Sequence, residues 1–194
     1  MASMNKTEAI QAILDATSVQ PIVFTTGFSS RIASGLDDRP NHFYMTGSMG
    51  LASSVGIGVA QASGLATLVV DGDGAVLMNP VGLITAGAHE SLPLAHIVLD
   101  DGQYASTGGQ AVPSRPDLGA LARDCGYLEV HRVHTAGELS ELLCGVLARC
   151  SSPVFIHCVL RGAEPPVPPR VEADLGDHAA RFGAKVRELA KERG

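Results

Sequence analysis

One stretch of the sequence, residues 66–110, constrains the fold more than any other. Two short apolar runs within it, residues 68–70 and 95–99, are typical of buried strands. A helical segment from about 79 to 91 lies between them. A crossover helix returns the chain in the same direction, so the two strands are expected to be parallel. The stretch therefore predicts a β-turn-α-β unit of an α/β protein.

Each of these strands leads into a turn that carries carboxylates. The first ends in Gly-Asp-Gly at 72–74, and the second ends in Asp-Asp-Gly at 100–102, about 25 residues later. In a parallel sheet both turns fall at the carboxyl edge, where ligands of open α/β sheets bind. Gly72 and Gly74 lack a Cβ, so their backbone can turn tightly and approach a ligand closely.

The residue types at this edge indicate one class of ligand. The free N–H groups at the start of the following helix attract phosphate. Asp73 and Asp101 can supply hard oxygen ligands to Mg²⁺ or Ca²⁺. Such an ion keeps phosphate oxygens and water as its remaining ligands. A turn or an aspartate pair of this kind, taken alone, is more often a solvated loop. The two together predict a diphosphate held through a divalent metal ion.

This combination resembles the cofactor motif of thiamine diphosphate enzymes, in which Gly-Asp-Gly is followed by Asn-Asn or Asp-Asn. The resemblance implies that Asp73, Asp101 and the backbone carbonyl of Gln103 bind Mg²⁺. This chain departs from the family pattern by having Asp100 and Asp101 as the pair. The second aspartate adds a negative charge beside a diphosphate, which bears on the affinity for the cofactor.

Within that family the sequence is most similar to phosphonopyruvate and sulfopyruvate decarboxylases. The similarity rests on HIVLDDGQYASTGGQ at 96–110, on FTTG at 24–27 with the following Ser30 and Arg31, and on TGSMG at 46–50. It covers roughly Pro21 to Pro113.

The resemblance also implies how the cofactor is held. A bulky apolar residue at the position of Met49 wedges between the two cofactor rings, and the Gly47 carbonyl accepts a hydrogen bond from the exocyclic amine. A methionine beside such a helix is otherwise usually a core residue, and Thr25 and Thr26 also suit the cap of the next helix. The implied cofactor contacts are Thr26, Gly47, Ser48, Met49, Gly72, Gly74, Ala75 and Tyr104.

The same family needs a glutamate that activates the pyrimidine ring, and it belongs to a separate pyrimidine-binding domain. Nothing before Pro21 is long enough to hold that domain. No glutamate in a similar context is found among Glu8, Glu90, Glu129, Glu138 and Glu141. The chain is therefore expected to contain no catalytic residue of its own and to act as the β-type half of a split enzyme. The expected partner is an α-type, pyrimidine-binding subunit in an α₂β₂ assembly.

Three functions remain open from the sequence. The favoured one is a split decarboxylase of a small anionic 2-oxo acid, such as phosphonopyruvate or sulfopyruvate. The second is a split carboligase that resembles acetolactate synthase or transketolase. The third is a non-catalytic nucleotide- or diphosphate-binding module.

Composition excludes other classes of partner and location. The 194 residues suit one domain, and the formal net charge of −6 argues against nucleic acid or an anionic membrane surface. No apolar run reaches the roughly 20 residues that span a bilayer, and the N-terminus lacks a signal-peptide core. The four cysteines form no metal pattern and are expected to be reduced, as small buried hydrophobes in a cytoplasmic chain.

The remaining pattern predicts a parallel sheet with helices on both faces, a three-layer α/β fold. Further strands are expected at 21–24, 42–45, 128–133 and 153–159, and further helices at 7–16, 51–63, 118–122, 137–150 and 177–192. Thr7 is a candidate cap for the first helix. A polar loop at 106–110 is of the sort that closes over a site or lies on the surface.

The whole chain, 1–194, is expected to be a single diphosphate-binding domain. Residues 161–194 form a proline-rich arm and a C-terminal helix whose apolar face carries Phe182, Val186 and Leu189. This face docks either on a partner subunit or on the chain's own sheet. Arg31 is a candidate contact for an acidic substrate or for a partner.

Overall fold

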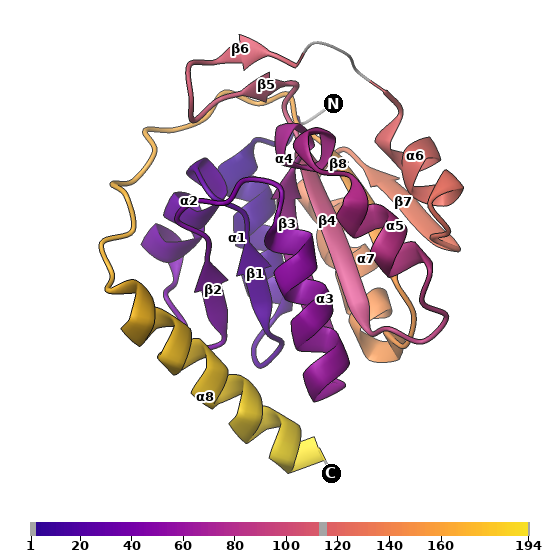
Figure 1. Ribbon diagram of the computed structural model, residues 1–194. Coiled ribbons are helices and arrows are strands. Elements are labelled where there is room, and N and C mark those ends of the chain that lie inside the picture. The colour runs from indigo at the N-terminus through magenta and orange to yellow at the C-terminus, as the bar shows by residue number, and fades with distance from the viewer. Residues whose placement is uncertain (1–2, 113–115, 194) are drawn as a thin grey trace.

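Six parallel strands form the central sheet of the computed structural model, in the order β2-β1-β3-β4-β8-β7 (Figure 1). The structure describes residues 3–112 and 116–193, so Pro113, at the end of the segment that carries the resemblance, lies outside the described residues. The strands are β1 (Ile22–Phe24), β2 (His42–Tyr44), β3 (Thr67–Gly72), β4 (Leu94–Asp100), β7 (Glu129–Val133) and β8 (Val154–Val159).

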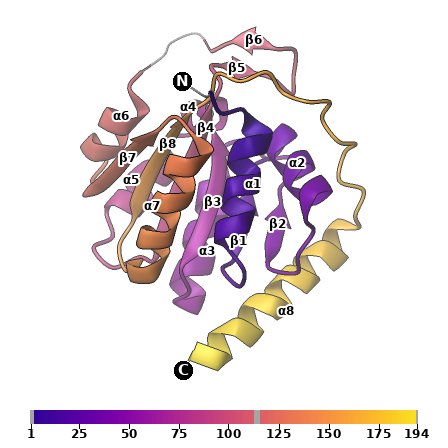
Figure 2. The ribbon, with the colours of Figure 1, turned by 180° about the vertical axis from the view of Figure 1, so that it is seen from behind.

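Helices cover both faces of this sheet (Figures 1 and 2). One layer consists of α1 (Lys6–Ala16), α2 (Phe28–Leu36) and α7 (Ala136–Arg149). The other consists of α3 (Ala52–Ser63), α4 (Asp73–Met78), α5 (Val81–Gly87) and α6 (Leu118–Asp124). The predicted three-layer α/β fold is confirmed.

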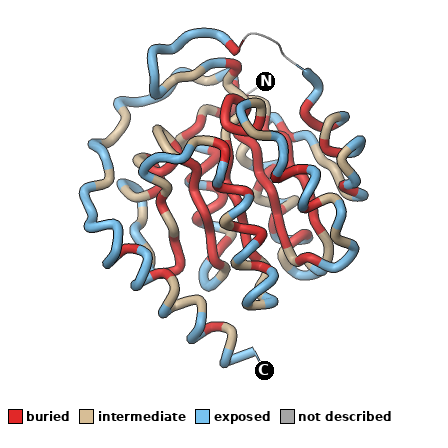
Figure 3. Tube along the Cα trace, viewed as in Figure 1, coloured by how far each residue is buried: buried red, intermediate tan, exposed pale blue. Residues whose placement is uncertain are grey.

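The strands are buried on both faces, as the red core of Figure 3 shows. In β3, Leu68 and Val70 pack under the α1–α7 layer, whereas Val69 packs under the α3 layer. Successive side chains of a strand point to opposite faces. Continuous apolar runs are therefore what a doubly covered parallel sheet requires, and they explain why the strands were readable from the sequence.

The helix predicted at about 79–91 is wrong in position and in continuity. The chain enters α4 at Asp73 itself, leaves it after Met78, and starts α5 at Val81. Pro80 lies between them, and a proline ring and its missing N–H interrupt a helix. The Asn79 side chain donates from Nδ2 to the Gly50 carbonyl at 2.9 Å, which ties this break to the turn before α3.

The first helix begins earlier than expected, and its cap is Asn5, not Thr7. The Asn5 side chain accepts the backbone N–H of Glu8, and the Glu8 carboxylate accepts the N–H of Asn5, a reciprocal capping box. The pattern Asn-x-x-Glu was present in the sequence. The other predicted helices and strands lie within about two residues of the observed ends.

The C-terminal segment packs on its own chain. The last helix, α8 (Leu175–Arg193), contacts both β2 and α3 and runs diagonally past the lower end of β2 in Figure 1. The Tyr44 N–H donates to His178 Nε2 at 2.9 Å, and the rings of Phe43 and Phe182 lie 5.2 Å apart between centroids. Docking of this helix on a partner remains a prediction.

The arm that precedes α8 also contacts its own chain. Arg31 donates from Nε to the Pro168 carbonyl at 2.7 Å, and its guanidinium lies over the Phe28 ring. These are contacts within the chain. A contact of Arg31 with a substrate or a partner remains a prediction.

The four cysteines are free in the structure, and the prediction that they are small buried hydrophobes is wrong for most of them. Only Cys158 is buried, whereas Cys144 is exposed and Cys125 and Cys150 are half-buried. Cys125 packs at the margin of the core on the α3 side of the sheet. Among the described residues, no helix is both long and apolar enough to cross a membrane.

Close backbone contact between α5 and the end of α6 generates the first prediction. A Cβ at Gly87 would lie 2.0 Å from the Cys125 carbonyl oxygen. Gly87→Ala should lower the free energy of unfolding by about 1–3 kcal/mol, as overpacking does. Gly145→Ala, on α7 with nothing within 4 Å, should raise it by about 0.5–1 kcal/mol. Urea unfolding of both variants measures this, and equal effects would contradict the contact.

Candidate cofactor site

The register of β3 and β4 brings the two carboxylate turns together. Asp71 pairs with Val98 and Gly72 with Leu99, so both strands end at the same level. The Asp73 carboxylate accepts the backbone N–H of Gly102 at 3.1 Å. The two turns predicted to share one sheet edge are therefore joined by a direct hydrogen bond.

Three carboxyl groups gather at this edge. Burial, together with the neighbouring carboxyls of Asp100 and Asp101, raises the pKa of Asp73 to about 7. Asp100 accepts a hydrogen bond from His157 Nε2 on β8 at 2.8 Å. Lys6 Nζ, from the first turn of α1, lies 2.8 Å from Asp101 Oδ2. Each aspartate of the pair thus has a partner from a distant part of the chain.

A pocket of about 50 Å³ opens beside Asp73. Among the predicted cofactor and metal contacts, those that line it are Thr26, Met49, Gly72, Asp73, Gly74, Ala75, Gln103 and Tyr104. The predicted contacts Gly47, Ser48 and Asp101 do not line it. The residues that sequence reasoning did not assign to the site are Lys6, Thr25, Phe28, Ser29, Ala105 and Ser106.

The turn between β2 and α3 aims Met49 into this pocket. Ser48 has a φ of 53°, in the left-handed region that residues other than glycine rarely adopt. Gly50, with a φ of 87°, lies against α4, where a Cβ would be 3.1 Å from the Ala75 carbonyl oxygen. A Cβ on Gly74 would be 3.4 Å from Met49 Cε. Met49 therefore faces the second glycine of the Gly-Asp-Gly triplet across the pocket.

The polar loop at 106–110 belongs to a hairpin that lies at the carboxyl edge (Figure 1). Its strands, β5 (Gln103–Tyr104) and β6 (Gln110–Ala111), are antiparallel. The Tyr104 ring covers Gly74, where a Cβ would lie 2.6 Å from its Cε1 atom. Ser106 Oγ covers Gly27 at the start of α2 in the same way. Because Gly74 and Gly27 have no Cβ, the Tyr104 and Ser106 side chains of the hairpin can pack directly on the backbone of the site.

The donor set at this edge fits a metal ion that is held mostly through a bound phosphate. Within the described residues, no group of three His, Cys, Asp or Glu side chains could hold a metal ion by itself. Two carboxylates and one backbone carbonyl leave coordination positions for phosphate oxygens and water, the arrangement Mg²⁺ favours. The small space over Gly74 likewise suits a ligand that approaches the backbone closely.

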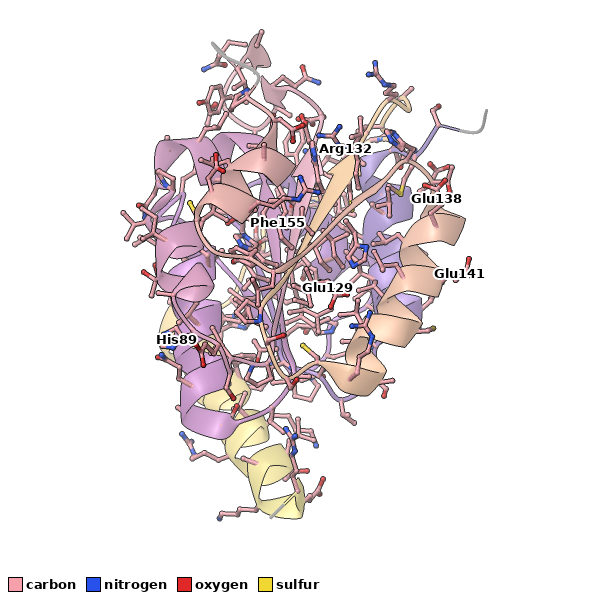
Figure 4. The ribbon with its side chains drawn as sticks, turned by 90° about the vertical axis from the view of Figure 1, so that its right-hand side faces the viewer. His89, Glu129, Arg132, Glu138, Glu141 and Phe155 are labelled. Carbon is pink, nitrogen blue, oxygen red and sulfur yellow. The ribbon has the colours of Figure 1, made fainter. Side chains whose placement is uncertain are left out.

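No described glutamate lines the pocket. Glu8 and Glu138 belong to capping boxes of α1 and α7, and Glu90 and Glu141 are exposed. Glu129 lies on β7, which is an edge strand of the sheet, and Glu138 and Glu141 lie on α7 (Figure 4). Hydrogen bonding to Arg149 lowers the pKa of Glu129 to about 2. None of these carboxyl groups is placed to act on a ligand in the pocket.

The contact between Gly74 and Tyr104 is directly testable. Gly74→Ala should displace the Tyr104 ring, because its Cβ would lie 2.6 and 2.8 Å from two ring atoms. Amide hydrogen exchange of residues 103–111 should then become at least several-fold faster. Gly72→Ala is the matched control, since a Cβ there meets nothing within 4 Å. Equal exchange in both variants would show that the ring does not depend on this glycine.

Comparison with known proteins identifies the family of the site. The family model described as thiamine pyrophosphate enzyme, C-terminal TPP binding domain, matches residues 26–158. A solved structure of a putative thiamin diphosphate-dependent enzyme from Mycobacterium smegmatis shares the fold, with a TM-score of 0.67 and 20% identity over 82% of this chain and 33% of that one.

Curated relatives match at higher identity. A phosphonopyruvate decarboxylase from Streptomyces viridochromogenes is 48% identical over 72% of this chain and 35% of its own length. One from Streptomyces hygroscopicus is 39% identical over 98% of this chain and 47% of its own length. The chain thus spans about a third to a half of these two relatives.

A sulfopyruvate decarboxylase subunit beta from Methanothermobacter thermautotrophicus is similar over nearly its full length. It is 35% identical over 95% of this chain and 96% of its own. The motifs at 46–50, 72–74 and 100–103 all fall inside the segment matched by the family model. The chain belongs to the thiamine pyrophosphate enzyme family, as a member of its C-terminal TPP-binding domains.

Proposed function

We propose that this chain is the diphosphate-binding subunit of a split thiamine diphosphate-dependent decarboxylase. The observation that carries this proposal is the pocket itself. It joins Asp73, Gly74 and Met49 with the hairpin residues Gln103 and Tyr104, while no described glutamate lines it. A pocket that has the cofactor's anchor but no described glutamate is what the diphosphate-binding half of a two-part site would present. The near full-length similarity to a protein named as a beta subunit supports the same division.

The residues of this chain would hold the cofactor and its metal ion. Asp73, Asp101 and the Gln103 carbonyl would bind Mg²⁺, which in turn would bind the diphosphate. Met49 would separate the two rings, and the Gly47 carbonyl would accept a hydrogen bond from the amine. Ser48 sets this turn through its left-handed backbone.

The chemistry itself belongs to the cofactor. When bound, thiamine diphosphate supplies the electron sink that makes loss of CO₂ from a 2-oxo acid feasible. The hairpin with Tyr104 and Ser106 would exclude water from the bound cofactor. Thr26 and Ala75, which also line the pocket, would complete the contacts.

The partner would be an α-type, pyrimidine-binding subunit in an α₂β₂ assembly. It would supply the activating glutamate and several contacts to the anionic substrate. The substrate class is a small anionic 2-oxo acid, of which phosphonopyruvate and sulfopyruvate are the named substrates of the relatives. We expect the assembly to be cytoplasmic, as the sequence suggested.

Copurification with the product of the adjacent reading frame tests this function. The mixture should release CO₂ from phosphonopyruvate, sulfopyruvate or both only when thiamine diphosphate and Mg²⁺ are present. Each subunit alone should release none. Pyruvate serves as the substrate that lacks the second anionic group.

Other outcomes would favour other functions. A complex that binds the cofactor but releases no free aldehyde, and joins an added acceptor aldehyde or keto acid instead, would indicate a carboligase. If no complex forms, and this chain binds diphosphates with no preference for thiamine diphosphate, the result would indicate a non-catalytic module.

The metal assignment has its own prediction. Asp73→Ala should weaken Mg²⁺-dependent retention of thiamine diphosphate at least about 10-fold, since even outer residues of metal sites cost that much when removed. Equilibrium dialysis with and without Mg²⁺ measures it. Asp15→Ala, an exposed aspartate on α1 that binds Gln11, is the control. Unchanged retention in Asp73→Ala would refute the role of Asp73.

A further inference from the structure

Lys6 occupies an unusual place for a lysine. It is the first residue of α1, yet its side chain is only 9% exposed, and its Nζ lies 2.8 Å from Asp101 Oδ2. Lysine is almost never buried to this extent unless it is paired. Lys6 also lines the pocket that contains Asp73 and Thr26. A buried cation therefore stands beside the proposed metal and diphosphate.

Both ends of the chain hold Lys6 in this position. The capping box of Asn5 and Glu8 sets the start of α1. The backbone N–H of Lys6 donates to the Glu164 carboxylate, and the Thr7 hydroxyl donates to the same group at 3.1 Å. Glu164 lies on the arm after β8. The α1 start is thus fixed from two sides, and the ammonium of Lys6 is fixed with it.

The charges at the edge explain why a fixed cation is useful there. Asp73 and the Asp100–Asp101 pair lie at one level of the sheet edge, because Gly72 pairs with Leu99 and the Asp73 carboxylate accepts the backbone N–H of Gly102 at 3.1 Å. A diphosphate brings further negative charge into the same small volume. Such interactions are several-fold stronger in a partly buried site than in water. Asp100 has His157 as a partner, and Asp101 has Lys6.

We propose that Lys6 is a charge-compensating residue of the cofactor site. By pairing with Asp101 it offsets the carboxylate that stands where the family pattern has an asparagine. The site then accepts an anionic metal–diphosphate complex in preference to a free divalent cation. This inference rests on the proposed function.

Lys6→Met removes the charge of the side chain and keeps most of its length. It should affect the binding of the metal–diphosphate complex and the binding of a free divalent cation differently. The complex of the full chain with its partner should bind thiamine diphosphate about 10- to 100-fold more weakly at saturating Mg²⁺, the range for a lost charged interaction. Isothermal titration calorimetry measures this affinity. Binding of Mn²⁺ alone, followed by electron paramagnetic resonance, should be unchanged or tighter. Loss of both affinities together would indicate a merely structural role and overturn the proposal.

Two matched variants serve as controls. Lys6→Arg keeps the charge and should retain most of the affinity for thiamine diphosphate. Lys185→Met removes a lysine of α8 that pairs with Glu188 away from the site, and it should change neither affinity. A loss with Lys6→Arg as large as with Lys6→Met would contradict a role based on charge.

A double-mutant cycle tests whether Lys6 acts through Asp101. In an Asp101→Asn background, Lys6→Met should cost less than about 3-fold in affinity for thiamine diphosphate, because the charge it offsets is gone. An equal cost in both backgrounds would overturn the proposal. Asp101→Asn serves only as the background of this cycle, because Asp101 is itself a proposed metal ligand. If Lys6→Met does not fold, Lys6→Gln takes its place in the same measurements, and an unchanged affinity for thiamine diphosphate in that variant would overturn the proposal.

Failure of the proposed function gives a different result. If the unmodified complex does not bind thiamine diphosphate with Mg²⁺, both the function and this inference are wrong. If it binds and Lys6→Met binds equally well, only the inference is wrong.

Discussion

The backbone register between β3 and β4 is the constraint on which the site depends. It places Gly72 opposite Leu99, so that the turns after the two strands start at one level. Both strands are buried on both faces, and a slip by one residue would turn every side chain to the opposite layer. The packing of the two helical layers therefore also specifies which carboxylates meet. Asp73 and the Asp100–Asp101 pair come together because the core permits no other register.

Concentrating three carboxyl groups in a half-buried edge is costly unless each finds a partner. Each of the three carboxyl groups has such a partner, and the partners come from different segments of the chain. His157 of β8 donates to Asp100, Lys6 of α1 pairs with Asp101, and the backbone of Gly102 donates to Asp73. Two of these partners are side chains, and the third is the backbone of the adjoining turn. Asp73 has a raised pKa because burial and its neighbours disfavour its charge. A divalent cation that is also bound by a diphosphate is the ligand proposed for this cluster.

Two segments of the chain form walls of the pocket in different ways. The turn at 46–50 is anchored to α4 through Asn79 and presents Met49 from a fixed backbone. The hairpin instead rests on Gly74 and Gly27 through the side chains of Tyr104 and Ser106.

Sequence patterns alone determined the strands, the two carboxylate turns and the family, because apolar runs and motif spacing are local properties. Two errors were also local. Pro80 marks the break between α4 and α5, and Asn5 with Glu8 marks the start of α1. The partners of the aspartates were beyond reach, since Lys6 and Asp101 are 95 residues apart in the chain. A lysine in the first turn of a helix reads as a solvated residue, and only the packing of α1 on the sheet, with its first residue next to Asp101, removes Lys6 from water. The sequence by itself thus specified which groups meet at the carboxyl edge of the sheet, and the tertiary structure decided which charges balance them, because ion pairs between distant segments follow from packing and leave no local pattern.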